Sequence, residues 1–312
     1  MNGPEPADAA RPGPADAIRL DAVVRQQGTF TLGPLDMTVP SGLVTGFVGP
    51  NGAGKTTAIK AMLGMVGIDA GSISVLDGAP GTRHGRIGVV LDSLALSRDW
   101  TAVSAACSLG RFYPDWDQGL LDDLLVRLDV PARVKVKNLS RGQGVKLQLA
   151  LALAHRPELL ILDEPTSGLD PLMERVFTDT VREAAEGGAT VLLSSHILAE
   201  VQDLCSHVTI IKGGRTVESG DLSYLRSLAE TAIRIGIGES DARRPRLVEA
   251  LAGLGAPVRP TGTRVETRVP SSLVPGILGA VAELGVDDVQ VEPASLEDLF
   301  MSHYSGDQGA RS

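Results

Sequence analysis

The chain is poor in aromatic residues and in cysteine, and it has no long uncharged apolar run. Only 3% of its 312 residues are Phe, Trp or Tyr, so we expect a core of Leu, Val, Ile and Ala. Cys107 and Cys205 are its only cysteines and lie in no metal-ligand spacing, which argues against a disulfide framework and favours a reducing compartment. No segment approaches the roughly 20 apolar residues of a membrane span. Work at a membrane would therefore need another chain to do the spanning.

Positive charge is also scarce. The 29 Lys and Arg residues are outnumbered by 38 Asp and Glu residues, and the net charge is −9. This balance disfavours binding to nucleic-acid phosphates, so we predict no nucleic-acid partner. Residues 1–17 are rich in Pro, Ala, Gly and Asp, with neither a basic start nor an apolar run. We expect a disordered leader there rather than a signal peptide, and a cytoplasmic protein.

One stretch matches a phosphate-binding loop. It reads Gly49-Pro50-Asn51-Gly52-Ala53-Gly54-Lys55-Thr56-Thr57 and fills every position of the pattern G-x-x-x-x-G-K-[ST]. Glycines let the backbone approach a phosphate, and the N–H groups and the N-terminus of the following helix attract its charge. Lys55 adds a cation for the outer phosphates, and Thr56 offers a hydroxyl to Mg²⁺. Residues 43–48 predict a buried strand and residues 55–66 an apolar-striped helix, so the order of elements predicts a nucleoside triphosphate site.

Further polar side chains follow two apolar runs. Residues 159–162 are continuously apolar and precede Asp163 and Glu164, and residues 191–195 predict a second buried strand before His196. Ligands bind at the carboxyl ends of parallel strands in open α/β sheets, so we expect these side chains near the phosphates held by Lys55. Taken singly, a carboxylate at a strand end is often only solvated, and a lone His is more often structural. Together with Lys55 they indicate a catalytic set.

Alternating strand and helix patterns predict a doubly wound α/β fold. Residues 18–24 and 30–39 predict a β-rich N-terminal lobe, and residues 93–155 a helical insertion in which Thr101 caps a helix over 102–112. We predict one domain over 18–221 and a small α+β domain over 222–312. The second domain is expected to have strands at 231–237, 264–269 and 286–291 and helices at 244–254 and 272–284. The carboxylates in 292–300 predict a capped, solvated helix start.

Five motifs occur in order along the chain: GPNGAGKTT at 49–57, LSRGQ at 139–143, LLILDEP at 159–165, SGLD at 167–170 and SSH at 194–196. With them, residues 18–221 resemble the ATP-binding subunit of ABC transporters, a P-loop NTPase. The C-terminal region is similar to the extension of the drug-export type. The resemblance implies ATP and Mg²⁺ as cofactors, a homodimer, and a separate membrane permease as partner, with the chain at the inner face of the cell membrane.

The resemblance also implies roles in hydrolysis. Asp163 would bind Mg²⁺ through water, and Glu164 would act as general base on the attacking water. His196 would hold the γ-phosphate and the base in register. Lys55 would bind the outer phosphates.

The resemblance also implies residues that act on the other subunit of a dimer or at the dimer interface. The signature segment would contact the γ-phosphate bound by the other subunit; it comprises Ser140, Arg141, Gly142 and Gln143. Asp170 would belong to a loop at the dimer interface. Read alone, a serine before a helix is usually only a cap.

Three positions depart from the family pattern. Family members usually carry Gln or Glu after the strand over 87–91, where it touches the metal; here the residue is Asp92, a shorter possible metal contact. The aromatic residue that stacks on adenine should fall near Gln27, which is not aromatic, and Phe30 is a possible substitute. Arg141 replaces the commoner glycine of the signature, as in many exporter subunits.

We therefore predict an ATP-binding and hydrolysing subunit that dimerises and powers a separate permease, most simply an exporter. The alternative is a soluble ABC ATPase that acts as a mechanical or regulatory module. Fused tandem ATPase domains or a long coiled-coil insertion would favour that alternative, and the sequence shows neither. A non-enzymatic binding module is disfavoured because Lys55, Asp163, Glu164 and His196 are all present. The sequence does not identify the cargo, because cargo contacts would lie on the permease.

Overall fold

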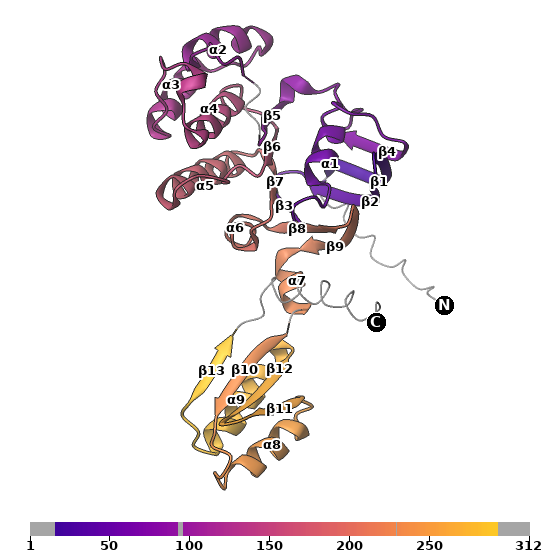
Figure 1. The fold of residues 1–312 in the computed structure, drawn as a ribbon, viewed down its shortest axis with the longest axis vertical. Coiled ribbons are helices and arrows are strands. Elements are labelled where there is room, and N and C mark those ends of the chain that lie inside the picture. Colours follow the sequence, from indigo (N-terminus) through magenta and orange to yellow (C-terminus); the bar gives the residue numbers. More distant parts are fainter. Residues whose placement is uncertain (1–15, 93–95, 229, 293–312) are drawn as a thin grey trace, which may run out of the picture. The chain divides into compact units, whose positions relative to one another are not determined.

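The computed structural model describes residues 16–92, 96–228 and 230–292 (Figure 1). The chain divides into two compact units, Met1–Ser219 and Gly220–Ser312. The leader predicted over 1–17 lies outside the described residues except for Asp16 and Ala17, which begin the first strand. The helix start predicted in 292–300 also lies outside them, apart from Glu292 at the end of the last strand.

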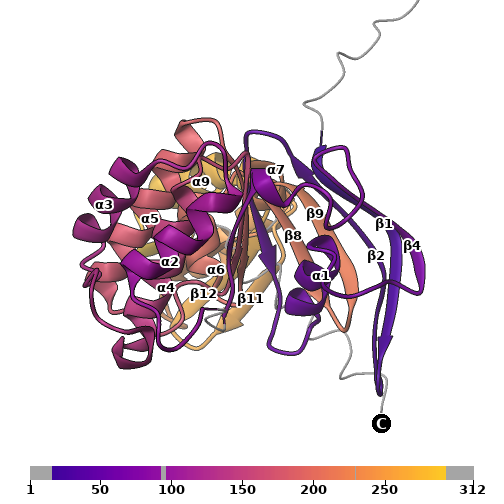
Figure 2. The same cartoon turned by 90° about the horizontal axis from the view of Figure 1, so that it is seen from above.

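The first unit is organised around a six-stranded sheet with the strand order β5-β6-β7-β3-β8-β9. Its strands are β3 (Val44–Val48), β5 (Ile87–Val90), β6 (Leu159–Asp163), β7 (Thr190–Ser195), β8 (His207–Lys212) and β9 (Arg215–Asp221). The five strands from β5 to β8 in this order pair in parallel. Helices α1 (Lys55–Met62) and α5 (Pro171–Glu186) lie on opposite faces of the sheet (Figure 2). Because both faces are covered, β6 and β7 are buried at every residue, and each contains a continuous apolar run, at residues 159–162 and 191–193.

The register of the sheet brings the polar strand ends together. Val48, the last residue of β3, lies opposite Ser195, the last residue of β7. Asp163, the last residue of β6, lies opposite Ser194. The phosphate loop, the Asp163-Glu164 pair and His196 therefore leave the sheet at one edge, as predicted for a parallel α/β sheet.

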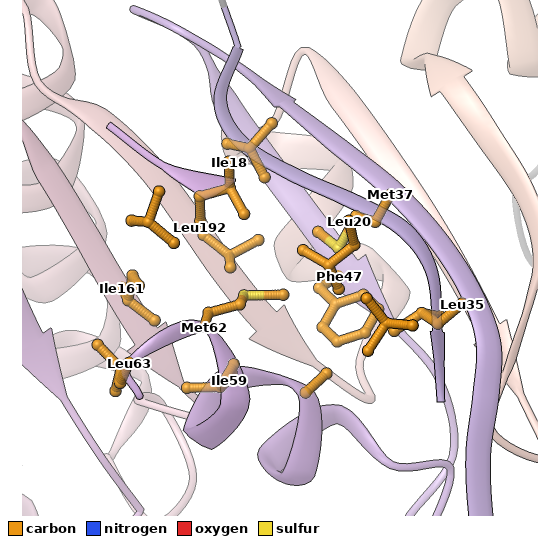
Figure 3. Close-up of a cluster of buried hydrophobic side chains, with 14 of the residues drawn as sticks. Ile18, Leu20, Leu35, Met37, Phe47, Ile59, Met62, Leu63, Ile161 and Leu192 are labelled. Carbon is orange, nitrogen blue, oxygen red and sulfur yellow. The ribbon is translucent and has the colours of Figure 1, made fainter. Parts of the chain in front are cut away.

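A second, antiparallel sheet forms the N-terminal lobe, with strand order β2-β1-β4. Its strands are β1 (Asp16–Gln27), β2 (Phe30–Pro40) and β4 (Ala70–Val75). The lobe is confirmed, and β1 is longer than predicted because it pairs with β2 from Asp16 to Gln27. Figure 3 shows the core that this sheet shares with α1 and the central sheet. Its buried members include Ile18, Leu20, Leu35, Met37, Phe47, Ile59, Met62, Ile161 and Leu192.

The insertion between β5 and β6 is helical, as predicted. It contains α2 (Ala102–Leu109), α3 (Gln118–Arg127) and α4 (Arg141–Leu153). Thr101 caps α2 through a reciprocal capping box with Ser104, which confirms the predicted cap. The helix predicted to reach residue 112 ends at Leu109, and a 3₁₀ turn (Gly110–Phe112) follows. Helix α6 (Leu198–Leu204) follows β7.

The second unit is an α+β structure, as predicted. Its elements in order are α7 (Leu222–Leu228), β10 (Thr231–Gly236), α8 (Arg244–Gly253), β11 (Val258–Thr261), β12 (Arg264–Val269), α9 (Val274–Glu283) and β13 (Val289–Glu292). The antiparallel sheet has the order β11-β12-β10-β13. The sequence did not predict β11, because this edge strand is short and contains Pro260, a residue that weakens strand patterns. Across the described residues of both units, no helix combines the length and the apolar character needed to cross a bilayer.

Candidate nucleotide site

The loop between β3 and α1 adopts a conformation that requires glycine. Gly52 and Gly54 have φ angles of +80° and +107°, in the left-handed region. A Cβ atom at Gly54 would lie 2.7 Å from Leu32 Cδ1 and 3.1 Å from Phe30 Cζ. The glycine therefore lets the loop pass close beneath the first residues of β2.

The Lys55 side chain is buried under the loop that it follows. It is only 4% exposed, and its Nζ donates hydrogen bonds to the carbonyl oxygens of Gly49, at 2.6 Å, and Pro50, at 3.2 Å. A buried ammonium needs such partners, because its desolvation is costly. The same Nζ lies 3.1 Å from Glu164 Oε1. The predicted phosphate cation and the predicted base are thus in direct contact.

Glu164 occupies a strained position between β6 and the segment that follows. Its φ angle of +47° is unusual for a residue with a side chain, and such positions concentrate at functional sites. Its backbone N–H donates to both the carbonyl oxygen and the hydroxyl of Ser194, each at 3.1 Å. The carboxylate Oε2 lies 3.3 Å from His196 Nδ1. The structure therefore holds Glu164 between Lys55 and His196.

Asp163 has one engaged oxygen and one free oxygen. The residue is 1% exposed, and its Oδ1 accepts a hydrogen bond of 2.6 Å from the Ser194 hydroxyl. Its Oδ2 is buried and has no hydrogen-bond partner among the described residues. A buried carboxylate oxygen without a partner fits a cation or a cation-bound water. Thr56, the other predicted metal contact, lines the same cavity as Lys55 and Glu164.

Two residues that support this site were not predicted. Ser194 bridges Asp163 and Glu164; it belongs to the SSH motif at 194–196, from which no role was predicted for it. Glu200 on α6 accepts hydrogen bonds from Thr166, at 2.7 Å, and from Ser195, at 2.6 Å, which ties the segment after Glu164 to the end of β7. Nothing in the local sequence around Glu200 predicts this contact.

A cavity of about 600 Å³ lies beside the phosphate loop. It is lined by Phe30, Asn51, Gly52, Gly54, Lys55, Thr56, Thr57, Asp92, Arg141 and Glu164. Of the two alternatives for adenine, Phe30 is in this lining. Gln27 is not in it; this residue is the exposed partner of Phe30 across the β1–β2 turn. The geometry favours Phe30 as the residue that contacts a base.

The signature segment lies mostly outside the phosphate cavity and lines a separate, smaller cavity. Ser140 caps α4 in a capping box with Gln143, each backbone N–H bonding the other residue's side chain at 3.1 Å. Asp170 caps α5 and accepts hydrogen bonds from two backbone N–H groups. A cavity of about 180 Å³ joins these segments and is lined by Ser140, Arg141, Gly142, Gln143, Lys146, Gly168, Leu169, Asp170 and Met173. The chain therefore brings Arg141, but not Ser140, Gly142 or Gln143, to its own phosphate cavity.

The described residues do not support a cysteine nucleophile or a metal site built from protein side chains alone. Burial raises the pKa of the Cys205 thiol to about 12, so this residue is not a thiolate nucleophile. Among the described residues, no group of three or more His, Cys, Asp and Glu side chains is arranged to hold a metal by itself. Mg²⁺ is usually bound by one or two carboxylates together with substrate phosphates. The site fits a cation of that kind, which the unpartnered Asp163 Oδ2 would help to hold.

Comparison with known proteins places the chain in a family. The ABC transporter family matches residues 32–167. The chain is 32% identical over 314 residues to the daunorubicin resistance ATP-binding protein DrrA3 of Streptomyces coeruleorubidus, a match that covers 93% of this chain and 96% of that protein. It is 36% identical over 214 residues to the Nod factor export ATP-binding protein I of Sinorhizobium fredii, with 65% of this chain and 62% of that protein covered. The chain thus spans less than two thirds of the length of this second relative.

A solved structure agrees with the sequence comparison. The ATP-binding subunit of an ABC transporter superposes with a TM-score of 0.62 at 25% identity, covering 67% of this chain and 92% of that one. The fold and the phosphate loop define a P-loop nucleotide-binding protein of the ABC cassette class. The chain belongs to the family of ABC transporter ATP-binding subunits.

Proposed function

We propose that this chain binds ATP, hydrolyses it as one half of a dimer, and powers a separate membrane permease that exports its cargo. The observation that carries the proposal is the position of the Glu164 carboxylate. It lies 3.1 Å from Lys55 Nζ and 3.3 Å from His196 Nδ1, at the lining of the phosphate-loop cavity. A carboxylate in this place can accept a proton from water that attacks the γ-phosphate.

The residues around Glu164 bind the phosphates and Mg²⁺ and orient the Glu164 carboxylate. Loop N–H groups and Lys55 attract the phosphate oxygens. In the transition state, the negative charge is distributed over the oxygens of the transferred phosphoryl group. Asp163 and Thr56 would hold Mg²⁺, which supplies positive charge beside the outer phosphates. Ser194 keeps Asp163 and the backbone of Glu164 in fixed register, and His196 orients the Glu164 carboxylate.

Dimerisation accounts for the signature segment. Ser140 and Gly142 lie at the start of α4 but outside the lining of their own phosphate cavity. A helix start with free N–H groups attracts anions. In a head-to-tail dimer, this helix start would face the γ-phosphate held by the second subunit, with Asp170 at the interface. Each active site would then consist of residues from both chains.

Export is supported by what the relatives are called. Their names record Nod factor export and daunorubicin resistance for those proteins, and none of the described helices of this chain can span a membrane. We expect the tagged chain to copurify from detergent-solubilised membranes with a single multi-span protein in a fixed ratio, as mass spectrometry would show. As a control, an untagged chain should leave that protein behind. Purification with ribosomes or with DNA repair proteins instead would favour the soluble alternative.

Adenine recognition gives a second test. Stacking of a base on an aromatic side chain is worth about 1–3 kcal/mol, so Phe30→Ala should weaken ATP binding roughly 5- to 150-fold. Gln27→Tyr should change it little, because Gln27 does not line the cavity. Titrations of both variants with ATP and GTP measure the effect, and Phe112→Ala, which removes an aromatic ring that is 77% exposed, is the control. Tighter ATP binding by Gln27→Tyr, together with unchanged binding by Phe30→Ala, would assign the base to Gln27 instead.

A further inference from the structure

An ion pair joins the phosphate cavity to the signature helix within one chain. Arg141 Nη2 donates to Asp92 Oδ1 at 2.6 Å. The same nitrogen lies 3.4 Å from the Ser167 hydroxyl, in the segment after β6. Asp92 follows the end of β5, and Arg141 is the first residue of α4. Both residues line the cavity that also contains Lys55.

This pair contributes little to the stability of the chain as a whole. The side chains of Arg141 and Asp92 are 59% and 58% exposed, and exposed ion pairs contribute little to the free energy of unfolding. Arg141 also places a positive charge at the N-terminus of α4, where it opposes the helix dipole. The first turn of α4 contains no acidic residue that would offset it. Asp92 supplies the missing negative charge from outside the helix.

A buried contact reinforces the link at the residue beside Asp92. Gln148, also on α4, is 7% exposed. Its side-chain amide donates to the carbonyl oxygen of Leu91 at 3.1 Å and accepts from the N–H of Leu91 at 3.3 Å. Two consecutive residues, Leu91 and Asp92, are therefore bound by the same helix. Of these two attachments, only the Asp92–Arg141 pair lies at the end of α4 that contains the signature.

We propose that Asp92 is a positioning residue that acts through Arg141. The ion pair holds the first turn of α4, and with it Ser140 and Gly142, at a fixed place relative to the phosphate cavity of the same chain. The position in which a subunit presents its signature to a partner would then depend on the position of its own nucleotide site. This assigns Asp92 a different role from the metal contact predicted from the sequence. The consequence for hydrolysis rests on the proposed function.

A double-mutant cycle tests the proposal. Asp92→Asn, Arg141→Gln and the double variant are compared by kcat, by the KM for ATP and by the Mg²⁺ concentration for half-maximal activity. Residues that act as a pair show non-additive effects. We expect each single change to lower kcat about fivefold and the double variant to be no worse than either. KM and the Mg²⁺ requirement should stay unchanged, and Arg141→Lys, which keeps the charge, should recover most of the loss.

A control variant shows whether any lost carboxylate has the same effect, and a second measurement tests the ion pair without relying on ATP hydrolysis. Asp99→Asn removes another exposed carboxylate of the same insertion, which pairs with Lys137 at 2.8 Å but does not line the cavity. It should leave kcat unchanged. Hydrogen exchange of the amides over 141–147 should speed up about fivefold in Asp92→Asn and Arg141→Gln, and not in Asp99→Asn.

Three outcomes would overturn the proposal. Additive effects on kcat would show that the two residues act separately. A higher Mg²⁺ requirement in Asp92→Asn alone would make Asp92 a metal contact. Unchanged hydrogen exchange in both variants would show that the pair does not hold α4. If the wild type hydrolyses no ATP, the proposed function fails, whereas the exchange measurement still decides whether the pair positions the helix.

Discussion

Glu164→Gln should lower the steady-state rate of ATP hydrolysis by about 10² to 10⁴-fold, the usual cost of removing a general base. The amide keeps the shape of the side chain but cannot accept the proton from the attacking water. Nucleotide binding should persist, because the phosphate loop and Lys55 are unchanged. ATP should then accumulate in a closed dimer, which gel filtration with ATP and Mg²⁺ would detect as a shift to twice the mass.

Glu158→Gln is the matched control for this prediction. Glu158 directly precedes β6, at the opposite end of the strand from Glu164, and it pairs with Arg86 on the surface. The same chemical change there should leave hydrolysis near the wild-type rate. Wild-type turnover in Glu164→Gln, measured in protein that binds ATP normally, would remove Glu164 from the role of base.

At an ATP concentration near the wild-type KM, Lys55→Ala and Ser140→Arg should each be nearly inactive alone and active when mixed. Lys55→Ala deletes a charged contact to the phosphates, worth about 1.5–3 kcal/mol, and should weaken ATP roughly 10- to 150-fold. Ser140→Arg blocks the signature with a bulky cation. In a head-to-tail heterodimer, the intact Lys55 of one chain meets the intact Ser140 of the other, so one composite site survives. Random pairing of equal amounts should restore on the order of a quarter of wild-type activity.

The controls separate binding from folding. Lys60→Ala changes an exposed lysine on the same helix α1 and should retain ATP affinity. Each parent variant, tested alone at the same total concentration, sets the background rate. If mixed dimers form, as shown by copurification of two different tags, and the mixture stays as inactive as its parents, the head-to-tail arrangement is wrong.

The sequence by itself determined the phosphate loop and the parts of the fold that depend on local pattern. A run of closely spaced glycines before Lys55 has few other uses, because such residues permit left-handed backbone and close approach to an anion. Continuous apolar runs ending in polar residues identified β6 and β7, because strands covered on both faces have no polar side. The placement of Asp163, Glu164 and His196 at one edge of the sheet then followed from parallel topology. The short strand β11 was missed because four residues with a proline carry too weak a pattern.

Only the tertiary structure decided which side chains touch. The contacts of Glu164 with Lys55 and of Ser194 with Asp163 join residues more than 30 positions apart or on different strands, so they depend on strand order and register. The same reason explains why Phe30 rather than Gln27 lines the cavity: packing places Phe30 and Leu32 of β2 beside Gly54 of the phosphate loop. Asp92 and Arg141 each looked like an isolated departure from the family pattern, and folding brings them into one ion pair. Long-range contacts of this kind are fixed by packing and leave no local trace in the sequence.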